Sequence, residues 1–178
     1  MRTGSNSKDL KILNRLLVRD IIRSEGPIAR FEIAKATGLT PSTVTVIVGE
    51  LLESGIIKEV GHGESSGGRR PILLELNPRA AHIFTASLQR GQMVAAVFDL
   101  TTNVLAEVHR NMDTSTPEDV VEAIGNAFEN LTRDAGVEPG SVLWCGVVTP
   151  GLVDVNGGLV QRSTNLGWLA IPLGPMIS

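Results

Sequence analysis

The sequence predicts an α/β chain made of two domains, one at residues 1–78 and one at residues 79–178. Two observations support this division. Apolar residues recur with the 3.6-residue period of helices before Asn77, and mostly with the two-residue period of strands after Pro78. The net charge also changes sign, since residues 1–78 hold 11 Lys and Arg against 9 Asp and Glu, whereas residues 79–178 hold 5 against 10. Only the first domain therefore suits a polyanion.

The composition is that of a globular protein, because 42% of the 178 residues are hydrophobic. The chain contains no apolar run long enough to span a membrane, and its N-terminus lacks the apolar segment of a signal peptide. We therefore expect a cytoplasmic protein with no membrane partner. Cys145 is the only cysteine, and the three histidines are scattered, so we expect neither a disulfide nor a metal site.

The first expected helix spans residues 7–23, where apolar residues recur at the spacing of one helical face and Gly26 and Pro27 follow. The face expected to be buried comprises Leu10, Leu13, Leu17 and Ile21, widened by Ile12, Leu16 and Ile22. A shorter helix is expected at residues 30–37, with Ile33 and Ala34 inward. Gly38 ends it, because glycine readily takes the positive φ of a tight turn.

A third helix is expected at residues 41–53. Thr40 suits its N-cap and Pro41 its first turn, because a side-chain oxygen can accept from free amides there and proline has no amide to satisfy. Its buried face is expected to hold Val44, Ile47, Val48, Leu51 and Leu52. A strand at 56–60, a glycine-rich loop and a returning strand at 72–76 follow. Three helices and a hairpin predict a winged helix-turn-helix, whose third helix enters the major groove of DNA.

Several side chains in this domain are candidates for contact with DNA. Small polar residues at the exposed start of the third helix can reach base edges or phosphates. Two arginines after two glycines can enter a narrow minor groove, and an arginine that opens the second helix, with no other obvious partner, can hold a phosphate. The candidates are Arg30, Thr40, Pro41, Ser42, Thr43, Thr45, Val46, Arg69 and Arg70. The alternatives are a merely well-capped helix and arginines that only keep an edge strand soluble.

The second domain reads as the start of an α/β fold of order βββαβ. Strands at 83–88, 93–100 and 104–109 are separated by turn residues and predict an antiparallel meander. A helix follows, with Thr116 as N-cap, Pro117 in its first turn and Gly136 at its end. The apolar run at 142–148 predicts a strand covered on both faces, and a hairpin is expected to turn at 156–158.

These motifs together resemble the ROK family, whose name stands for repressor, open reading frame, kinase. In the first domain the resemblance rests on GPIARFEIA at 26–34, TPSTV at 40–44 and GGRRP at 67–71. In the second it rests on FDL at 98–100, GVVTPGLVD at 146–154 and STNLGW at 163–168, in the family's order and spacing. The resemblance covers nearly the whole chain.

The resemblance implies an actin-like, ribonuclease-H-like second domain and a sequence-specific DNA-binding transcription regulator. Such a protein would repress genes of carbohydrate uptake or metabolism, bind a double-stranded operator as a homo-oligomer, and respond to a sugar or sugar phosphate. Asn165 and Gly167 match a segment near the sugar in the family, although packing of the loop would also explain them. Val46 stands where such helices often carry a basic side chain, and Ala29 replaces the usual Ser or Thr cap.

Family members are longer, and this sequence lacks their catalytic aspartate, their cysteine-rich zinc motif and their second lobe. The sugar pocket is therefore expected to be incomplete here, with no cofactor held within this chain. A sugar kinase is one alternative, but the turn at 87–92 has no acidic residue to meet a metal-bound phosphate, so we expect no enzyme and no catalytic residue. The other alternative is a fragment that acts only by oligomerising.

Overall fold

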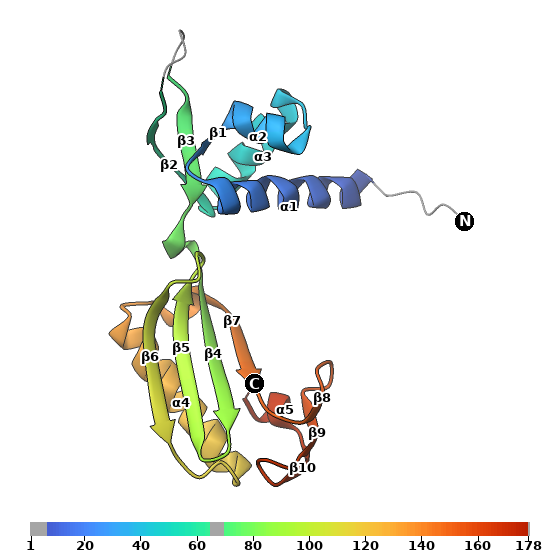
Figure 1. Ribbon diagram of the computed structural model, residues 1–178, viewed down its shortest axis with the longest axis vertical. Coiled ribbons are helices and arrows are strands. Elements are labelled where there is room, and N and C mark those ends of the chain that lie inside the picture. The colour runs from blue at the N-terminus through green and yellow to red at the C-terminus, as the bar shows by residue number, and fades with distance from the viewer. Residues whose placement is uncertain (1–6, 65–69, 178) are drawn as a thin grey trace, which may run out of the picture. The chain divides into compact units, whose positions relative to one another are not determined.

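The structure, a computed structural model, describes residues 7–64 and 70–177 and divides into two units, Met1–Ala80 and Ala81–Ser178 (Figure 1). Each unit has its own hydrophobic core. Among the helices of the described ranges, none has the length and hydrophobicity that a bilayer crossing requires.

Unit 1 consists of three helices and a small three-stranded sheet. Its elements are α1 (Ser7–Glu25), β1 (Ile28–Ala29), α2 (Arg30–Thr37), α3 (Pro41–Glu53), β2 (Ile57–His62), β3 (Ile72–Leu76) and a 3-10 turn at Pro78–Ala80. Helices α2 and α3 and strand β3 have the bounds that the sequence predicts. Strand β1 is not predicted, and it pairs with β3 so that the sheet has the order β1-β3-β2.

The turn between α2 and α3 is built as the sequence predicts. Gly38 takes a φ of 71°, and its N–H donates to the carbonyl of Ala34 at 3.0 Å. Thr40 caps α3, because its Oγ1 accepts from the N–H of Thr43 at 3.2 Å. Ala29 offers α2 no such side-chain oxygen, but Glu32 accepts from the Ala29 N–H at 2.9 Å. This bond supplies half of a capping box.

The predicted buried face of α1 is right at Ile21 and Ile22 but wrong along the rest of the helix. Val18 and Ile22 are the residues of α1 that are buried in the core of unit 1, where the inward face of α3 also lies. The leucines expected inside are instead exposed, by 50% at Leu10, 59% at Leu13 and 41% at Leu17. Helix α1 carries two apolar stripes, and the stripe with more leucines faces solvent in unit 1.

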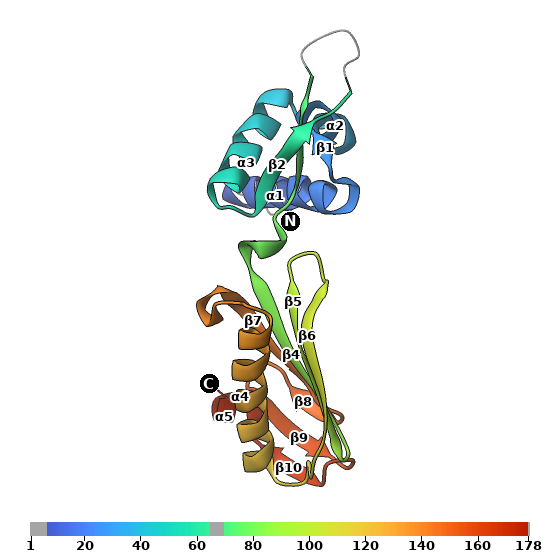
Figure 2. The ribbon, with the colours of Figure 1, turned by 90° about the vertical axis from the view of Figure 1, so that its left-hand side faces the viewer.

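Unit 2 is a four-stranded sheet covered on one face by a helix, with a small second sheet beside it. Its elements are β4 (His82–Gln89), β5 (Gln92–Asp99), β6 (Val104–Asn111), α4 (Pro117–Asp134), a 3-10 turn at Pro139–Ser141, β7 (Val142–Val148), β8 (Leu152–Asp154), β9 (Leu159–Ser163), β10 (Trp168–Ile171) and α5 (Leu173–Ile177). The large sheet has the order β6-β5-β4-β7, with β7 parallel to β4 and α4 packed on its face (Figure 2). The predicted order βββαβ and the β8–β9 hairpin are confirmed.

Two details of unit 2 differ from the predictions. Strand β7 has the predicted bounds but lies at an edge of the sheet, and Leu143, Trp144 and Val148 are 63–74% exposed rather than covered. An apolar run predicts only that a strand is suited to burial. In this structure no element of the described chain packs on these three side chains, so they remain exposed. Thr116 stands at the N-cap of α4 but makes no capping hydrogen bond with its side chain.

The turn from β5 to β6 is tied together by the buried carboxylate of Asp99. It accepts hydrogen bonds of 2.7–3.0 Å from the backbone N–H groups and side chains of Thr101 and Asn103. Burial by itself would raise the pKa of Asp99, but these hydrogen bonds outweigh it and hold the pKa below its usual value. The ionised form of Asp99 therefore stabilises unit 2.

We expect Asp99→Asn to lower the free energy of unfolding of unit 2 by about 1–3 kcal/mol near neutral pH, because the turn loses charge-assisted hydrogen bonds. The folded-state pKa is the lower one, so the contribution of the carboxylate is complete above the unfolded value of about 3.9 and is lost as the pH falls through the folded value. Urea unfolding from neutral pH to about pH 3 measures it. A difference between the two proteins that stays constant over this range would contradict the assignment.

Candidate nucleic-acid interface

The first half of α3 presents small side chains to solvent. Val44, Ile47 and Val48 are buried in the core of unit 1, which turns the intervening positions outward. Pro41, Ser42, Thr45 and Val46 are exposed, whereas Thr43 is half-buried and Thr40 is exposed at the cap. The structure thus brings the predicted contact residues of α3 to one accessible end of the helix.

The hydroxyl groups at this end are already engaged in local hydrogen bonds. Thr40 Oγ1 lies 2.9 Å from the hydroxyl of Ser42 and 2.8 Å from that of Thr43, so the capping alternative accounts for these contacts. Thr45 differs, because its hydroxyl donates its only proton to the carbonyl of Pro41 at 2.8 Å. Its remaining capacity is to accept, which suits the amino group of adenine or cytosine in the major groove.

Arg30 is the first residue of α2 and has a partner that the sequence did not indicate. Its Nη2 donates to Oε1 of Glu59, on β2, at 3.3 Å. The expectation that Arg30 lacks a partner is therefore wrong. The two residues are far apart in the sequence, and only the pairing of β1 and β2 on either side of β3 brings them together. Both side chains remain partly accessible, Arg30 at 33% and Glu59 at 45%.

The loop end of the β2–β3 hairpin lies beside the start of α2. Arg70 is exposed just before β3, whereas Arg69 lies outside the described residues. A hollow of about 330 Å³ is lined by Arg30, Phe31, Arg70, Pro71 and Ile72. Phe31 is 63% exposed and was missed as a candidate. Its signal is positional, because it stands two residues before the inward Ile33 and so lies on the opposite side of α2.

Other cations of unit 1 are paired with carboxylates away from this hollow. Lys11 Nζ lies 2.7 Å from Oε1 of Glu50, and its hydrogen bond holds the pKa of Glu50 below the usual value. Lys58 pairs with Glu75 across β2 and β3 at 3.0 Å. Within the described ranges, no carboxylate pairs with Arg70. Among the described residues, Arg70 therefore offers a positive charge beside the hollow that no carboxylate neutralises.

In unit 2, Asn165 and Gly167 lie in the turn between β9 and β10. Both are exposed, whereas Leu166 and Trp168 are buried, and Trp168 Nε1 donates to the carbonyl of Ser115 at 3.0 Å. The alternating pattern holds the turn in place and leaves Asn165 accessible. No hollow described in unit 2 includes these two residues.

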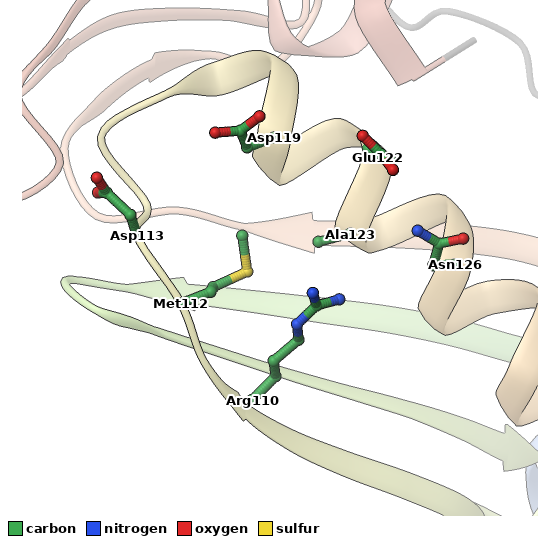
Figure 3. A pocket seen from close by; sticks show the side chains of 7 residues that line it. All are labelled: Arg110, Met112, Asp113, Asp119, Glu122, Ala123 and Asn126. Carbon is green, nitrogen blue, oxygen red and sulfur yellow. The ribbon is translucent and has the colours of Figure 1, made fainter.

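A hollow of about 280 Å³ lies elsewhere in unit 2, between β6 and α4 (Figure 3). Arg110 of β6 points toward α4, where Glu122 and Asn126 lie. The hollow is lined by Arg110, Met112, Asp113, Asp119, Glu122, Ala123 and Asn126. The acidic side chains outnumber the one arginine, so the surface does not favour an anion such as a sugar phosphate.

Comparison with known proteins defines the class of unit 1. A family described as winged helix-turn-helix DNA-binding matches residues 5–58. Together with the hairpin β2–β3, this match shows that unit 1 is a winged helix-turn-helix domain.

Most of the chain is similar to known transcriptional regulators. It is 34% identical over 152 residues to the DNA-binding transcriptional dual regulator NagC of Escherichia coli K12, covering 85% of this chain and 37% of that protein. It is 28% identical over 167 residues to the xylose repressor of Bacillus spizizenii, covering 94% and 43%. A solved ROK family transcriptional regulator, a homolog of the E. coli MLC protein, matches with a TM-score of 0.72 and 26% identity over 94% of this chain and 43% of that one.

These matches confirm the resemblance to ROK-family transcriptional regulators and the predicted fold class, a winged helix-turn-helix followed by an actin-like α/β domain. The chain spans less than half the length of these relatives.

Proposed function

We propose that this chain acts as a sequence-specific DNA-binding transcription regulator, a repressor of genes for sugar uptake or metabolism. The observation that supports it most is the accessible start of α3 in a winged helix-turn-helix, with Arg30 and Arg70 lining one hollow where strand β3 begins. The similarity to NagC and to the xylose repressor supports the class of target genes.

In this proposal α3 lies in the major groove. Ser42 and Thr45 face base edges, and the exposed Val46 packs against apolar groups such as the methyl of thymine. Arg30 and Arg70 contact the sugar-phosphate backbone, which fixes the orientation of the domain without reading sequence. With valine at position 46, the affinity depends more on these arginines than it would with a basic side chain there.

The other partners are proposed on the same grounds. A homo-oligomer would place two copies of α3 on the half-sites of a double-stranded operator. A sugar or sugar phosphate would act through unit 2, where Asn165 is accessible. We propose no enzymatic activity, because the tight turn between β4 and β5 carries no carboxylate that could meet a metal-bound phosphate. Phosphorylation of a sugar by this chain would overturn that view.

The experiment that tests the proposal is selection of bound duplexes from a random-sequence pool, followed by Thr45→Val. Valine keeps the shape of threonine but removes the acceptor, so we expect a loss of about 1–3 kcal/mol on the selected sequence and relaxed preference at one base pair. Ser54→Ala is the matched control, since Ser54 also donates to a backbone carbonyl, that of Leu51, but at the far end of α3. Selection of no sequence, with no binding at low salt, would contradict the proposal.

A further inference from the structure

The hollow beside α2, lined by Arg30, Phe31, Arg70, Pro71 and Ile72, combines positive charge with an exposed aromatic ring. Two arginines line it, and the exposed ring of Phe31 forms part of its wall. Its volume of about 330 Å³ far exceeds that of a water molecule, about 30 Å³. The surroundings therefore offer positive charge and one aromatic face to the same ligand.

The register of the small sheet explains why these residues meet. Ile28 lies opposite Leu74 and Ala29 opposite Leu73, in an antiparallel pair. The pairing ends at Ala29, so the first two residues of α2, Arg30 and Phe31, begin beside the start of β3. They line the hollow together with Pro71 and Ile72. The hollow is thus set by backbone pairing on one side and by the start of a helix on the other.

Glu59 reaches the same arginine from the other side of β3. Glu59 is on β2, where it pairs with Leu74 of β3. Its Oε1 accepts a hydrogen bond from Nη2 of Arg30 at 3.3 Å. An ion pair between two partly exposed side chains is weak, on the order of 0.2–1 kcal/mol. An anion that binds Arg30 more strongly can therefore replace the carboxylate of Glu59, because little free energy is lost when this ion pair breaks.

We propose that this hollow binds one phosphate of the DNA backbone, which displaces Glu59 from Arg30, while the adjoining deoxyribose packs on Phe31. The inference rests on the proposed function and adds a named competitor to it. Arg70 supplies the second positive group, and it has no carboxylate partner in the described chain to give up. Glu59 then acts as the counter-ion of Arg30 without DNA, and weakens binding because its freed charge lies near the phosphate.

The test compares Glu59→Gln with Glu75→Gln in the full chain. Both changes remove one negative charge from the hairpin β2–β3, but Glu75 pairs with Lys58 rather than with Arg30. We expect Glu59→Gln to bind random-sequence duplex DNA about two- to fivefold more tightly than Glu75→Gln does. The slope of log affinity against log salt should also be steeper by up to about one unit, since no cation is taken up by a freed carboxylate.

A second set of variants separates displacement from a general effect of charge. In an Arg30→Ala background, Glu59→Gln should no longer differ from Glu75→Gln. Inorganic phosphate is the competitor that tests the kind of anion: it should weaken DNA binding by the unaltered chain more than chloride does at the same ionic strength. Equal effects of phosphate and chloride would contradict a phosphate site in the hollow.

The outcomes are distinct for the two claims. Absence of DNA binding by the unaltered chain would overturn the proposed function and this inference together. Binding by the unaltered chain with equal affinities for Glu59→Gln and Glu75→Gln would overturn the inference alone. Thermal melting of both variants checks that a change in folding does not cause the difference.

Discussion

The double variant Arg30→Ala/Arg70→Ala is expected to bind random-sequence duplex DNA about 30- to 1,000-fold more weakly than the unaltered chain at low salt. Each lost contact between a guanidinium and a phosphate should cost about 1–2 kcal/mol at this partly exposed surface, and 1.4 kcal/mol corresponds to a factor of ten. The slope of log affinity against log salt should become shallower by about two units, one for each phosphate contact. Fluorescence anisotropy across a salt series measures both quantities.

The control for this variant is Arg110→Ala/Arg133→Ala, which removes the same charge from exposed positions in unit 2. It should leave the salt slope unchanged, because neither arginine belongs to the proposed phosphate contacts of unit 1. The preference among duplex sequences should survive in the first variant, since contacts with phosphates do not read bases. Equal salt slopes for the two variants would contradict the location of the backbone contacts.

Gly151→Ala is expected to destabilise unit 2 by about 3 kcal/mol or more. Gly151 has a φ of 127°, and a Cβ there would lie 2.3 Å from the carbonyl oxygen of Arg162 and 2.9 Å from Cα of Ser163. Both atoms belong to the backbone of β9, and the neighbouring Leu152 pairs with Arg162. Neither can withdraw without loss of the β8–β9 pairing.

The matched control is Gly167→Ala in the same unit. Gly167 also has a positive φ, 75°, but a Cβ there would meet no atom within 4 Å. Only the conformational penalty remains, about 1–2 kcal/mol for a residue with a side chain. Urea unfolding of unit 2 distinguishes the two substitutions, and equal losses of stability would show that β9 moves aside for the added methyl group.

Local chemistry made much of the fold predictable. The bounds of α2 and α3 follow from a glycine with positive φ and a Thr-Pro start, and both signals act within a few residues. The exposed positions on α3 follow from helical periodicity in the same way. The period of the apolar residues also predicted the element order of unit 2, and the resemblance to a known family added the expectation of an actin-like fold.

The failures share one physical cause, since each depends on residues that are distant in the sequence. Strand β1 has two residues, too few to show a period, and it exists because β3 offers a free edge. The sequence of α1 supports two apolar faces, and only the packing of the other helices selects the one with Val18 and Ile22. Glu59 could not be linked to Arg30 from any local pattern, because the two residues are 29 positions apart in the sequence and strand β3 lies between β1 and β2.

The uncovered edge of the large sheet gives the chain a spectroscopic property. Its two tryptophans are in opposite surroundings, with Trp144 on β7 74% exposed and Trp168 3% exposed. A collisional quencher in solution has access to the indole of Trp144 and almost none to that of Trp168. A molecule that covers β7 will protect the fluorescence of Trp144 from the quencher, whereas the fluorescence of Trp168 stays unchanged and serves as an internal reference. Binding at this edge can therefore be followed without an attached dye.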